Sequence, residues 1–338
     1  MEALAQTAPV SWKEFERNWK NWHWYTRVYR QRMLSRLLPN RGTYVYDEPW
    51  DNLIILDACR YDTFKEQNRI EGKLESRISR GSATQEFLLE NFSKHPKHTT
   101  FRDVVYVTAN PWVSWLVRDK FYKIYPVWDY GWDDDLRTVP PGIVVSEALE
   151  ARKRHQDKRL IIHFMQPHFP PLVGRPEAET GQSGMRRAVL AGVDPFVFME
   201  GVFSDGGTNP ELLDTNCEGL LAKGELVKKE VLHLYEENLR IVLSHVSGLT
   251  KMLPGTTVVS SDHGDLFGER LGILYPFRTY GHTWGLRLGA LIRVPWLTIV
   301  NPDNEVTRAE VEKGYFPHDQ EIEDDEKIKD RLRKLGYV

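Results

Sequence analysis

NLIILDACRYDTF, residues 52–64, contains a continuous apolar run that ends on an aspartate, Asp57. A run so dense in Leu and Ile predicts a strand buried on both faces, as in a parallel sheet. Four similar runs follow with helical stretches between them, which places the predicted strands at 52–56, 104–107, 160–164, 256–260 and 290–294. This alternation predicts an α/β protein with a mostly parallel central sheet flanked by helices on both faces. Ligands bind such sheets at the carboxyl ends of the strands.

The composition is that of a folded protein with no nucleic-acid partner. The chain has 338 residues, of which 41% are hydrophobic, and its 45 Lys and Arg nearly balance its 48 Asp and Glu. A formal net charge of −3 excludes a generally basic nucleic-acid binder. Two cysteines are too few for a disulfide framework, and the N-terminus lacks the pattern of a secretory signal. We therefore expect a cytoplasmic protein.

Residues 11–41 form the one strongly basic segment, with eight Lys and Arg against two Glu. Its aromatic residues recur every three or four positions, which predicts an amphipathic helix. This helix packs on the protein's own core or makes a peripheral contact with an anionic membrane surface, and both interpretations stay open. We expect residues 1–42 to be this basic aromatic segment and residues 43–338 to be a catalytic domain. Residues 172–224, rich in Gly and without a strand pattern, predict an insertion or lid.

Two predicted strands end on groups that bind cations. The first ends on Asp57, and the second, in TTVVSSDHGDLFGER at residues 256–270, ends on Asp262 followed by His263 and Gly264. Carboxylate and imidazole donors on one turn suit a divalent metal ion. Capping of the following helix is the structural alternative for an aspartate such as Asp57. Two such strand ends in one chain favour a metal site.

A candidate nucleophile lies in SRGSATQEF, residues 79–87, where a loop enters a predicted helix. Thr84 falls in the first turn, so its hydroxyl lies near the positive end of the helix dipole. A bound divalent cation lowers the pKa of such a hydroxyl and makes it a nucleophile. Ser82 and Gln85 also fit a capping box, which is the structural alternative for the hydroxyls of this loop.

Three further loops offer groups that bind an oxyanion. His168 lies in MQPHFPP between prolines, Asn110 follows the predicted strand at 104–107, and His282 lies in the glycine-flanked GHTWG. A histidine in such a place hydrogen-bonds an ester oxygen or protonates a leaving group. Three other histidines are interpreted as structural or surface residues, and these are His163, His233 and His245.

The ordered motifs LDACRYD, GSATQEF, MQPHFPP, SSDHGD and GHTWG resemble those of the sulfatase-like branch of the alkaline phosphatase superfamily. The resemblance extends over roughly residues 44–338, apart from 172–224. It implies an alkaline-phosphatase-like fold and a metal-dependent enzyme that forms a covalent intermediate. By position it assigns Asp57, Asp262 and His263 as metal ligands and Thr84 as the metal-bound nucleophile. The residues that contact the substrate group are then His168, His282 and, as the least specific match, Asn110.

The chain also departs from the family pattern. It has no CxPSR motif, which argues against formylglycine chemistry, and Asp57 is followed by Ala58 where sulfatases often have a second aspartate. These departures favour one divalent ion, with Mn²⁺, Mg²⁺, Zn²⁺ and Ca²⁺ left open, as in the threonine-dependent phosphoglycerol and phosphoethanolamine transferases that the chain resembles. The leading hypothesis is a hydrolase that cleaves a sulfate or phosphate ester through a covalent threonine intermediate.

Two alternatives to the hydrolase remain. One is a phosphoglycerol- or phosphoethanolamine-type transferase that acts on a glycan or lipid. The other is a non-catalytic module that binds a membrane surface or a glycan through residues 11–41. The identity of the ester, a small molecule or a glycan or lipid, and the oligomeric state stay open at this stage.

Overall fold

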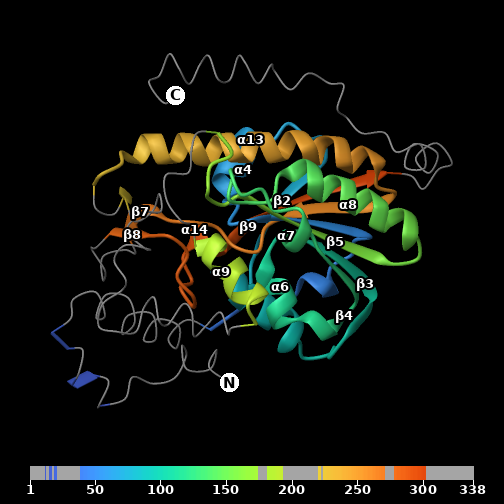
Figure 1. The fold of residues 1–338 in the computed structure, drawn as a ribbon, viewed down its shortest axis with the longest axis horizontal. Coiled ribbons are helices and arrows are strands. Elements are labelled where there is room, and N and C mark those ends of the chain that lie inside the picture. The colour runs from blue at the N-terminus through green and yellow to red at the C-terminus, as the bar shows by residue number, and fades with distance from the viewer. Residues whose placement is uncertain are drawn as a thin grey trace.

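The computed structural model describes residues 39–173, 181–192, 220–221, 224–270 and 278–301, together with Trp12, Phe15, Glu16, Trp19 and Lys20. Seven strands form a central sheet in the order β2-β9-β6-β1-β5-β3-β4 (Figure 1). A separate two-stranded sheet pairs β7 with β8. The strands are β1 (Asn52–Asp57), β2 (Lys73–Ile78), β3 (Phe101–Thr108), β4 (Phe121–Pro126), β5 (Arg159–Pro167), β6 (Gly255–Ser260), β7 (Phe267–Arg270), β8 (Arg278–Tyr280) and β9 (Arg293–Asn301).

The direction of the strands confirms the predicted mostly parallel sheet. β1 lies at the centre and runs parallel to both of its neighbours, β5 and β6. β3 is parallel to β5 and to β4, whereas β9 is antiparallel to β6 and β2. The carboxyl ends of β1, β5, β6 and β3 therefore meet at one edge, where the predicted site residues follow the strands.

Helices cover both faces of the sheet because the central strand has apolar side chains on each of its two faces. Ile54 and Leu56 point into one core cluster, and Leu53 and Ile55 point into the other. The first face is covered by α4 (Tyr61–Gln67), α8 (Pro141–Arg154) and α13 (Lys228–Met252), and the second by α5 (Thr84–Leu88), α6 (Pro111–Leu116) and α9 (Gly181–Leu190) (Figure 1). A π-helical turn at Leu89–Ser93 continues α5, and the remaining short helices include α7 (Val127–Tyr130) and α14 (Gly289–Ile292).

The structure corrects the sequence prediction at one strand and adds two others to the central sheet, besides β7 and β8. The predicted strand at 290–294 is wrong in its bounds, because α14 occupies 289–292 and β9 runs from Arg293 to Asn301. β2 and β4 were not predicted. Both are edge strands whose residues are only partly buried, so they carry polar side chains that hide the apolar pattern.

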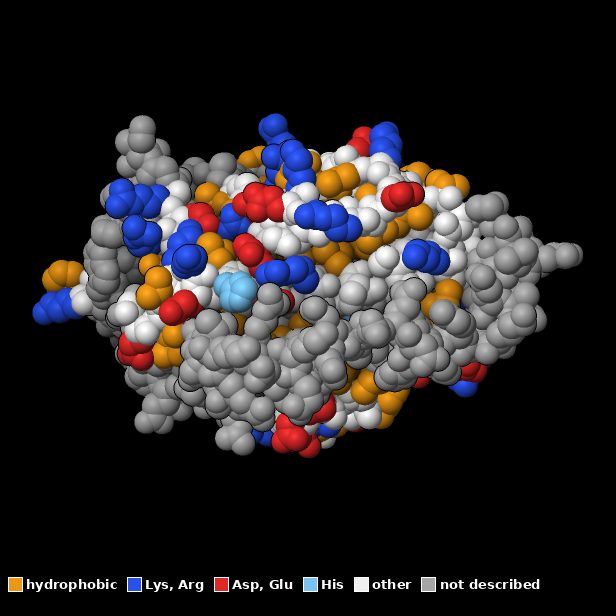
Figure 2. Space-filling model, turned by 90° about the horizontal axis from the view of Figure 1, so that it is seen from above, with side chains coloured by type: hydrophobic (Ala, Val, Ile, Leu, Met, Phe, Trp, Pro, Cys, Tyr) orange, Lys and Arg blue, Asp and Glu red, His pale blue; other side chains and the backbone are white. Residues whose placement is uncertain are grey.

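The described surface over α13 is solvated. Seen from that side, basic and acidic side chains are interspersed, with no patch of a single sign (Figure 2). Among the helices of the described ranges, none combines the length and apolarity that crossing a membrane requires. Most of the basic segment at 11–41 and most of the predicted lid at 172–224 lie outside the described residues, as does everything after 301.

Candidate active site

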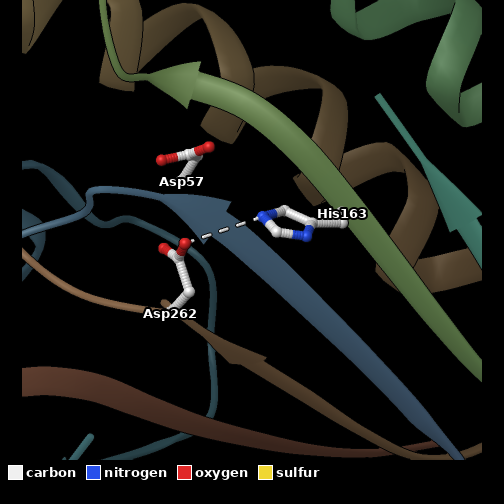
Figure 3. A group of neighbouring side chains, drawn as sticks. All are labelled: Asp57, His163 and Asp262. Carbon is white, nitrogen blue, oxygen red and sulfur yellow. Dashed lines mark ion pairs between the residues drawn. The ribbon is translucent and has the colours of Figure 1, made fainter. Parts of the chain in front are cut away.

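The two predicted carboxylates meet at the carboxyl edge of the sheet. Asp57 is the last residue of β1, and Asp262 follows the neighbouring strand β6 by two residues (Figure 3). Both side chains are buried. Asp57 does not cap a helix, because α4 begins only at Tyr61 with Arg60 as its N-cap residue. The carboxylate is therefore available for another purpose.

Thr84 lies against Asp262, as the metal-site hypothesis requires. The residue is the first of α5 and is buried. Its hydroxyl donates a hydrogen bond to Asp262 Oδ2 at 2.8 Å and lies 3.2 Å from His263 Nε2. Thr84 thus contacts two residues that lie 178 and 179 positions further along the chain.

The ring of His263 is oriented by its own backbone. Its Nδ1 lies 2.7 Å from the carbonyl oxygen of Gly264, which can only accept, so Nδ1 carries the proton. Nε2 then presents its lone pair to the carboxylates, at 3.7 Å from Asp57 Oδ1 and 3.4 Å from Asp262 Oδ2. An imidazole whose other nitrogen donates to a carbonyl is the usual form of a metal ligand.

The four predicted ligands fit one divalent cation. Donor atoms that share a small cation at about 2.0–2.2 Å from it lie roughly 3–4 Å apart. The distances from His263 Nε2 to Thr84, Asp262 and Asp57 fall in this range. In addition, Asp57 Oδ1 is buried and has no hydrogen-bond donor in the described structure. A buried carboxylate oxygen without a donor is costly, and a cation would satisfy it.

His163 is a site residue that the sequence analysis missed. It lies on β5, is fully buried, and directs Nε2 toward Asp262 Oδ2 at 3.9 Å (Figure 3). Ligand atoms of Asp57, His163 and Asp262 all lie within 4.8 Å of one another, so His163 offers a second nitrogen donor. Its Nδ1 lies 3.1 Å from the hydroxyl of Tyr106. A polar residue inside an otherwise apolar run, LIIHFM, was the available signal.

Burial controls the charges of this group. Burial, and after it the charge of Asp262, raises the pKa of Asp57 well above its ordinary value. Burial, reinforced by His282, holds the pKa of His263 well below that of a free histidine, and burial lowers the pKa of His163 to about 4. Two adjacent carboxylates with neutral histidines form a site that lacks a positive charge. A bound cation would supply that positive charge.

The backbone around the carboxylates is shaped to hold them. Ala58 adopts a φ of 57°, a left-handed conformation that a residue with a Cβ rarely takes. Its N–H donates to Asp262 Oδ1 at 3.1 Å, which joins the loop after β1 to the loop after β6. Gly264 is required by a close approach, because a Cβ there would lie 2.0 Å from the carbonyl oxygen of Ala290.

Asn110 lies beside Asp57. Its Nδ2 donates to Asp57 Oδ2 at 2.7 Å, and its Oδ1 accepts from the N–H of Trp112 to cap α6. The side chain is buried. Asn110 therefore orients a predicted metal ligand, and the substrate contact predicted for it stays a prediction.

His168 and His282 lie next to this group and are partly exposed. The ring of His282 stacks on that of His263 with centroids 4.7 Å apart, and it meets the ring of His168 edge-on at 4.9 Å. Nδ1 of His168 donates to the carbonyl oxygen of Phe169 at 2.7 Å. The structure thus brings every predicted catalytic residue to one edge of the sheet.

The capping box predicted from Ser82 and Gln85 is wrong. The N-cap residue of α5 is Ala83, which makes no side-chain cap. Instead, the N–H and hydroxyl of Ser82 lie 2.9 and 2.8 Å from Oε2 of Glu86. The helix starts one residue later than a Ser82 cap requires, so the box spacing does not apply.

No family model matches this sequence, and no curated protein is similar to it in sequence. Solved structures are similar to it at low identity. One is the integral membrane protein lipooligosaccharide phosphoethanolamine transferase A (EptA) from Neisseria meningitidis, with 11% identity over 78% of this chain and 50% of that one, at a TM-score of 0.42.

A second is the C-terminal periplasmic domain of phosphoethanolamine transferase EptC from Campylobacter jejuni, with 15% identity over 78% of this chain and 82% of that one, at a TM-score of 0.42. A third is the lipoteichoic acid synthase LtaP from Listeria monocytogenes, with 11% identity over 75% of this chain and 65% of that one, at a TM-score of 0.40. The chain thus spans half the length of the Neisseria protein and about two thirds of the Listeria protein.

Proposed function

We propose that this protein is a metal-dependent enzyme that cleaves a phosphate or sulfate ester by taking the transferred group onto Thr84. The observation that carries the proposal is the contact of the Thr84 hydroxyl with Asp262 Oδ2 and His263 Nε2 inside a buried group of cation donors. A threonine hydroxyl held only for structure has no need of a carboxylate and a neutral imidazole beside it, with a second carboxylate next to that imidazole.

The residues that would hold the cation are Asp57, Thr84, Asp262 and His263, with His163 as a further nitrogen donor. A divalent cation in this place lowers the pKa of the hydroxyl and neutralises charge on the oxygens of the ester. The donor set of carboxylates, hydroxyl and imidazole suits Mn²⁺, Mg²⁺ or Zn²⁺, and suits Ca²⁺ only with additional oxygen ligands.

The protein's own residues orient the attack and move the protons. The hydrogen bond from Thr84 to Asp262 Oδ2 points the hydroxyl proton away from the incoming ester and gives that proton an acceptor. The threonine oxygen then bonds to phosphorus or sulfur, and the bond to the leaving oxygen breaks. His168, whose Nδ1 donates to the carbonyl oxygen of Phe169, gives the proton of Nε2 to that leaving oxygen when both of its ring nitrogens carry a proton, and it is left as the neutral imidazole.

The second step releases the group from Thr84. Water as the acceptor makes the enzyme a hydrolase, and an alcohol of a glycan or lipid makes it a transferase; the site residues serve both. Residues 11–41 support a lipid or glycan acceptor at a membrane surface, because basic and aromatic side chains together favour an anionic lipid interface.

The test is a panel of aryl phosphate monoesters, diesters and sulfates, assayed with the full chain carrying its metal. We expect Thr84→Ala to lower kcat by about a thousandfold or more, because it removes the nucleophile. Thr84→Ser keeps a hydroxyl at this position. Intact-protein mass spectrometry after a quench detects the covalent adduct on that hydroxyl. Thr100→Ala, at an exposed threonine, serves as the matched control.

Adding an alcohol acceptor, such as glycerol or a glycolipid, separates transfer from hydrolysis by product analysis. Unchanged turnover in both Thr84→Ala and Asp262→Ala would contradict the proposal. A protein that binds no divalent metal and turns over no ester, but binds anionic vesicles, would support the non-catalytic module instead.

A further inference from the structure

A buried carboxylate that plays no part in the chemistry proposed above lies two residues after the nucleophile. Glu86 belongs to α5, and only about 5% of its side chain is exposed. It forms an ion pair with Arg287, whose side chain is 11% exposed and lies 201 positions further along the chain. Within the described part of the chain, neither residue makes a hydrogen bond or an ion pair with the predicted cation donors.

Glu86 is the centre of a network that joins two segments of the site. Its Oε2 accepts from the N–H of Ser82 at 2.9 Å and from the N–H of Gly285 at 3.2 Å, in addition to Arg287. The hydroxyl of Ser82 lies 2.9 Å from the carbonyl oxygen of Thr283. We call Ser82, Glu86, Gly285 and Arg287 the Glu86 network.

The two segments that this network joins each carry a catalytic candidate. Thr84 lies between Ser82 and Glu86, and His282 lies just before Thr283 and Gly285. The ring of His282 in turn stacks on His263 and meets His168 edge-on. The position of His282 over the site is therefore set by a loop whose backbone is bound to the nucleophile's own helix.

A buried ion pair is an inefficient way to stabilise a fold, since the desolvation of both charges offsets most of their attraction. Its more useful property is geometric specificity. A bidentate carboxylate–guanidinium pair with added N–H donors fixes the relative orientation of the groups that form it. In this protein the arrangement being fixed is that of residues 281–287 relative to α5.

We propose that Glu86 and Arg287 are positioning residues that hold His282 against His263 and His168, so that this histidine meets the transferred group. The inference rests on the proposed function and on the substrate contact that the sequence predicts for His282, and the hydrogen bonds above show how the loop of that histidine is held. Misplacing a catalytic group by about 1 Å can lower a rate by about a hundredfold, so the effect of losing the network is measurable.

The test compares Glu86→Gln with Glu90→Gln in the full-length protein. Gln keeps the shape of Glu86 but removes the charge that pairs with Arg287. Glu90 is the matched control, because it is a partly buried carboxylate on the same segment that pairs with Arg80 and Lys94 and not with residues 281–287. Arg287→Lys is the conservative variant, which keeps the positive charge but cannot form the bidentate contact of a guanidinium.

Hydrogen–deuterium exchange gives a readout that does not depend on activity. We expect peptides covering 281–288 to exchange about fivefold faster or more in Glu86→Gln, because the Gly285 amide loses a charged acceptor, while peptides covering 256–263 stay unchanged. Binding of Mn²⁺ stays within about twofold, because no cation donor is altered. Unchanged exchange at 281–288 would overturn the proposal.

Kinetics in two backgrounds shows whether Glu86 acts through His282. We expect Glu86→Gln to lower kcat by about tenfold or more with a smaller change in KM, Arg287→Lys to fall between it and the wild type, and Glu90→Gln to match the wild type. In the His282→Ala background, Glu86→Gln should lower the rate of Thr84 modification by less than about twofold. An equal loss in both backgrounds would show that Glu86 acts elsewhere and would overturn the proposal.

If the wild type turns over no ester, the proposed function fails, and the exchange comparison still decides whether the Glu86 network holds residues 281–287.

Discussion

At the scale of single residues, Asn110 orients the carboxylate of Asp57, a predicted metal ligand. Its Nδ2 is a donor to Asp57 Oδ2, while Asp57 Oδ1 faces His263. Removing a partner that orients a metal ligand typically lowers metal affinity by about 10–100-fold. We expect this loss in Asn110→Ser, where the serine hydroxyl can still cap α6 at Trp112. Isothermal titration with Mn²⁺ measures the affinity, and a melting temperature close to that of the wild type shows that the cap is kept.

His163 predicts a pH dependence of stability in the metal-free protein. Its pKa falls from 6.5 to about 4 through burial, so the unfolded chain binds a proton that the folded chain does not. The contribution of His163 to the free energy of unfolding is therefore complete above pH 6.5 and is lost as the pH falls through 4. Its size is roughly 3 kcal/mol.

Replacing His163 by Gln, whose side-chain amide can still hydrogen-bond the hydroxyl of Tyr106, should flatten the fall in stability between these pH values. Urea denaturation at a series of pH values measures it. His233→Gln, at a histidine with a 59% exposed side chain, should leave the profile as in the wild type. Parallel profiles for wild type and His163→Gln would contradict the assigned pKa.

At the scale of elements, β1 determines where the site lies, because it is the central strand and ends on Asp57. Every residue of it is buried, and Leu56 packs in the core beneath α8 and α13. We expect Leu56→Ala to lower the free energy of unfolding by about 2–5 kcal/mol. Val300→Ala, on the 70% exposed Val300 of β9, should change it by less than about 0.5 kcal/mol. Chemical denaturation of the two variants measures the difference, and equal effects would place Leu56 outside the core.

At the scale of the whole molecule, binding of the cation and stability of the fold are coupled. The proposed cation donors come from the ends of β1 and β6 and the start of α5, so a bound ion would join three elements. A ligand present at a hundred times its Kd stabilises the folded state by about 2.7 kcal/mol. We expect a chelator to lower the melting temperature and Mn²⁺, Zn²⁺ or Mg²⁺ to restore it.

Asp57→Asn and Asp262→Asn should abolish this response to metal, because each removes a charged oxygen donor. Asp157→Asn, at a carboxylate with a 75% exposed side chain, is the control that should keep it. Differential scanning fluorimetry with each cation measures the shift. A response that persists in both Asp57→Asn and Asp262→Asn would mean that the metal binds elsewhere.

The amino-acid sequence by itself determined the class of fold and singled out the four residues that we propose as cation donors. Apolar runs that end on Asp57 and Asp262 are local patterns, and the geometry of a parallel sheet then places strand ends at a common edge. Thr84 was recognisable because its loop has the composition of a helix start, although the helix begins without the predicted cap.

Only the tertiary structure decided which distant residues support these donors. His163 belongs to the site because β5 lies next to β1 and turns that side chain to the same face, which an isolated run of β5 residues does not reveal. Glu86 and Arg287 pair across 201 positions. The physical reason is that local sequence sets the conformation of each segment, whereas contacts between segments depend on strand order and on helix packing.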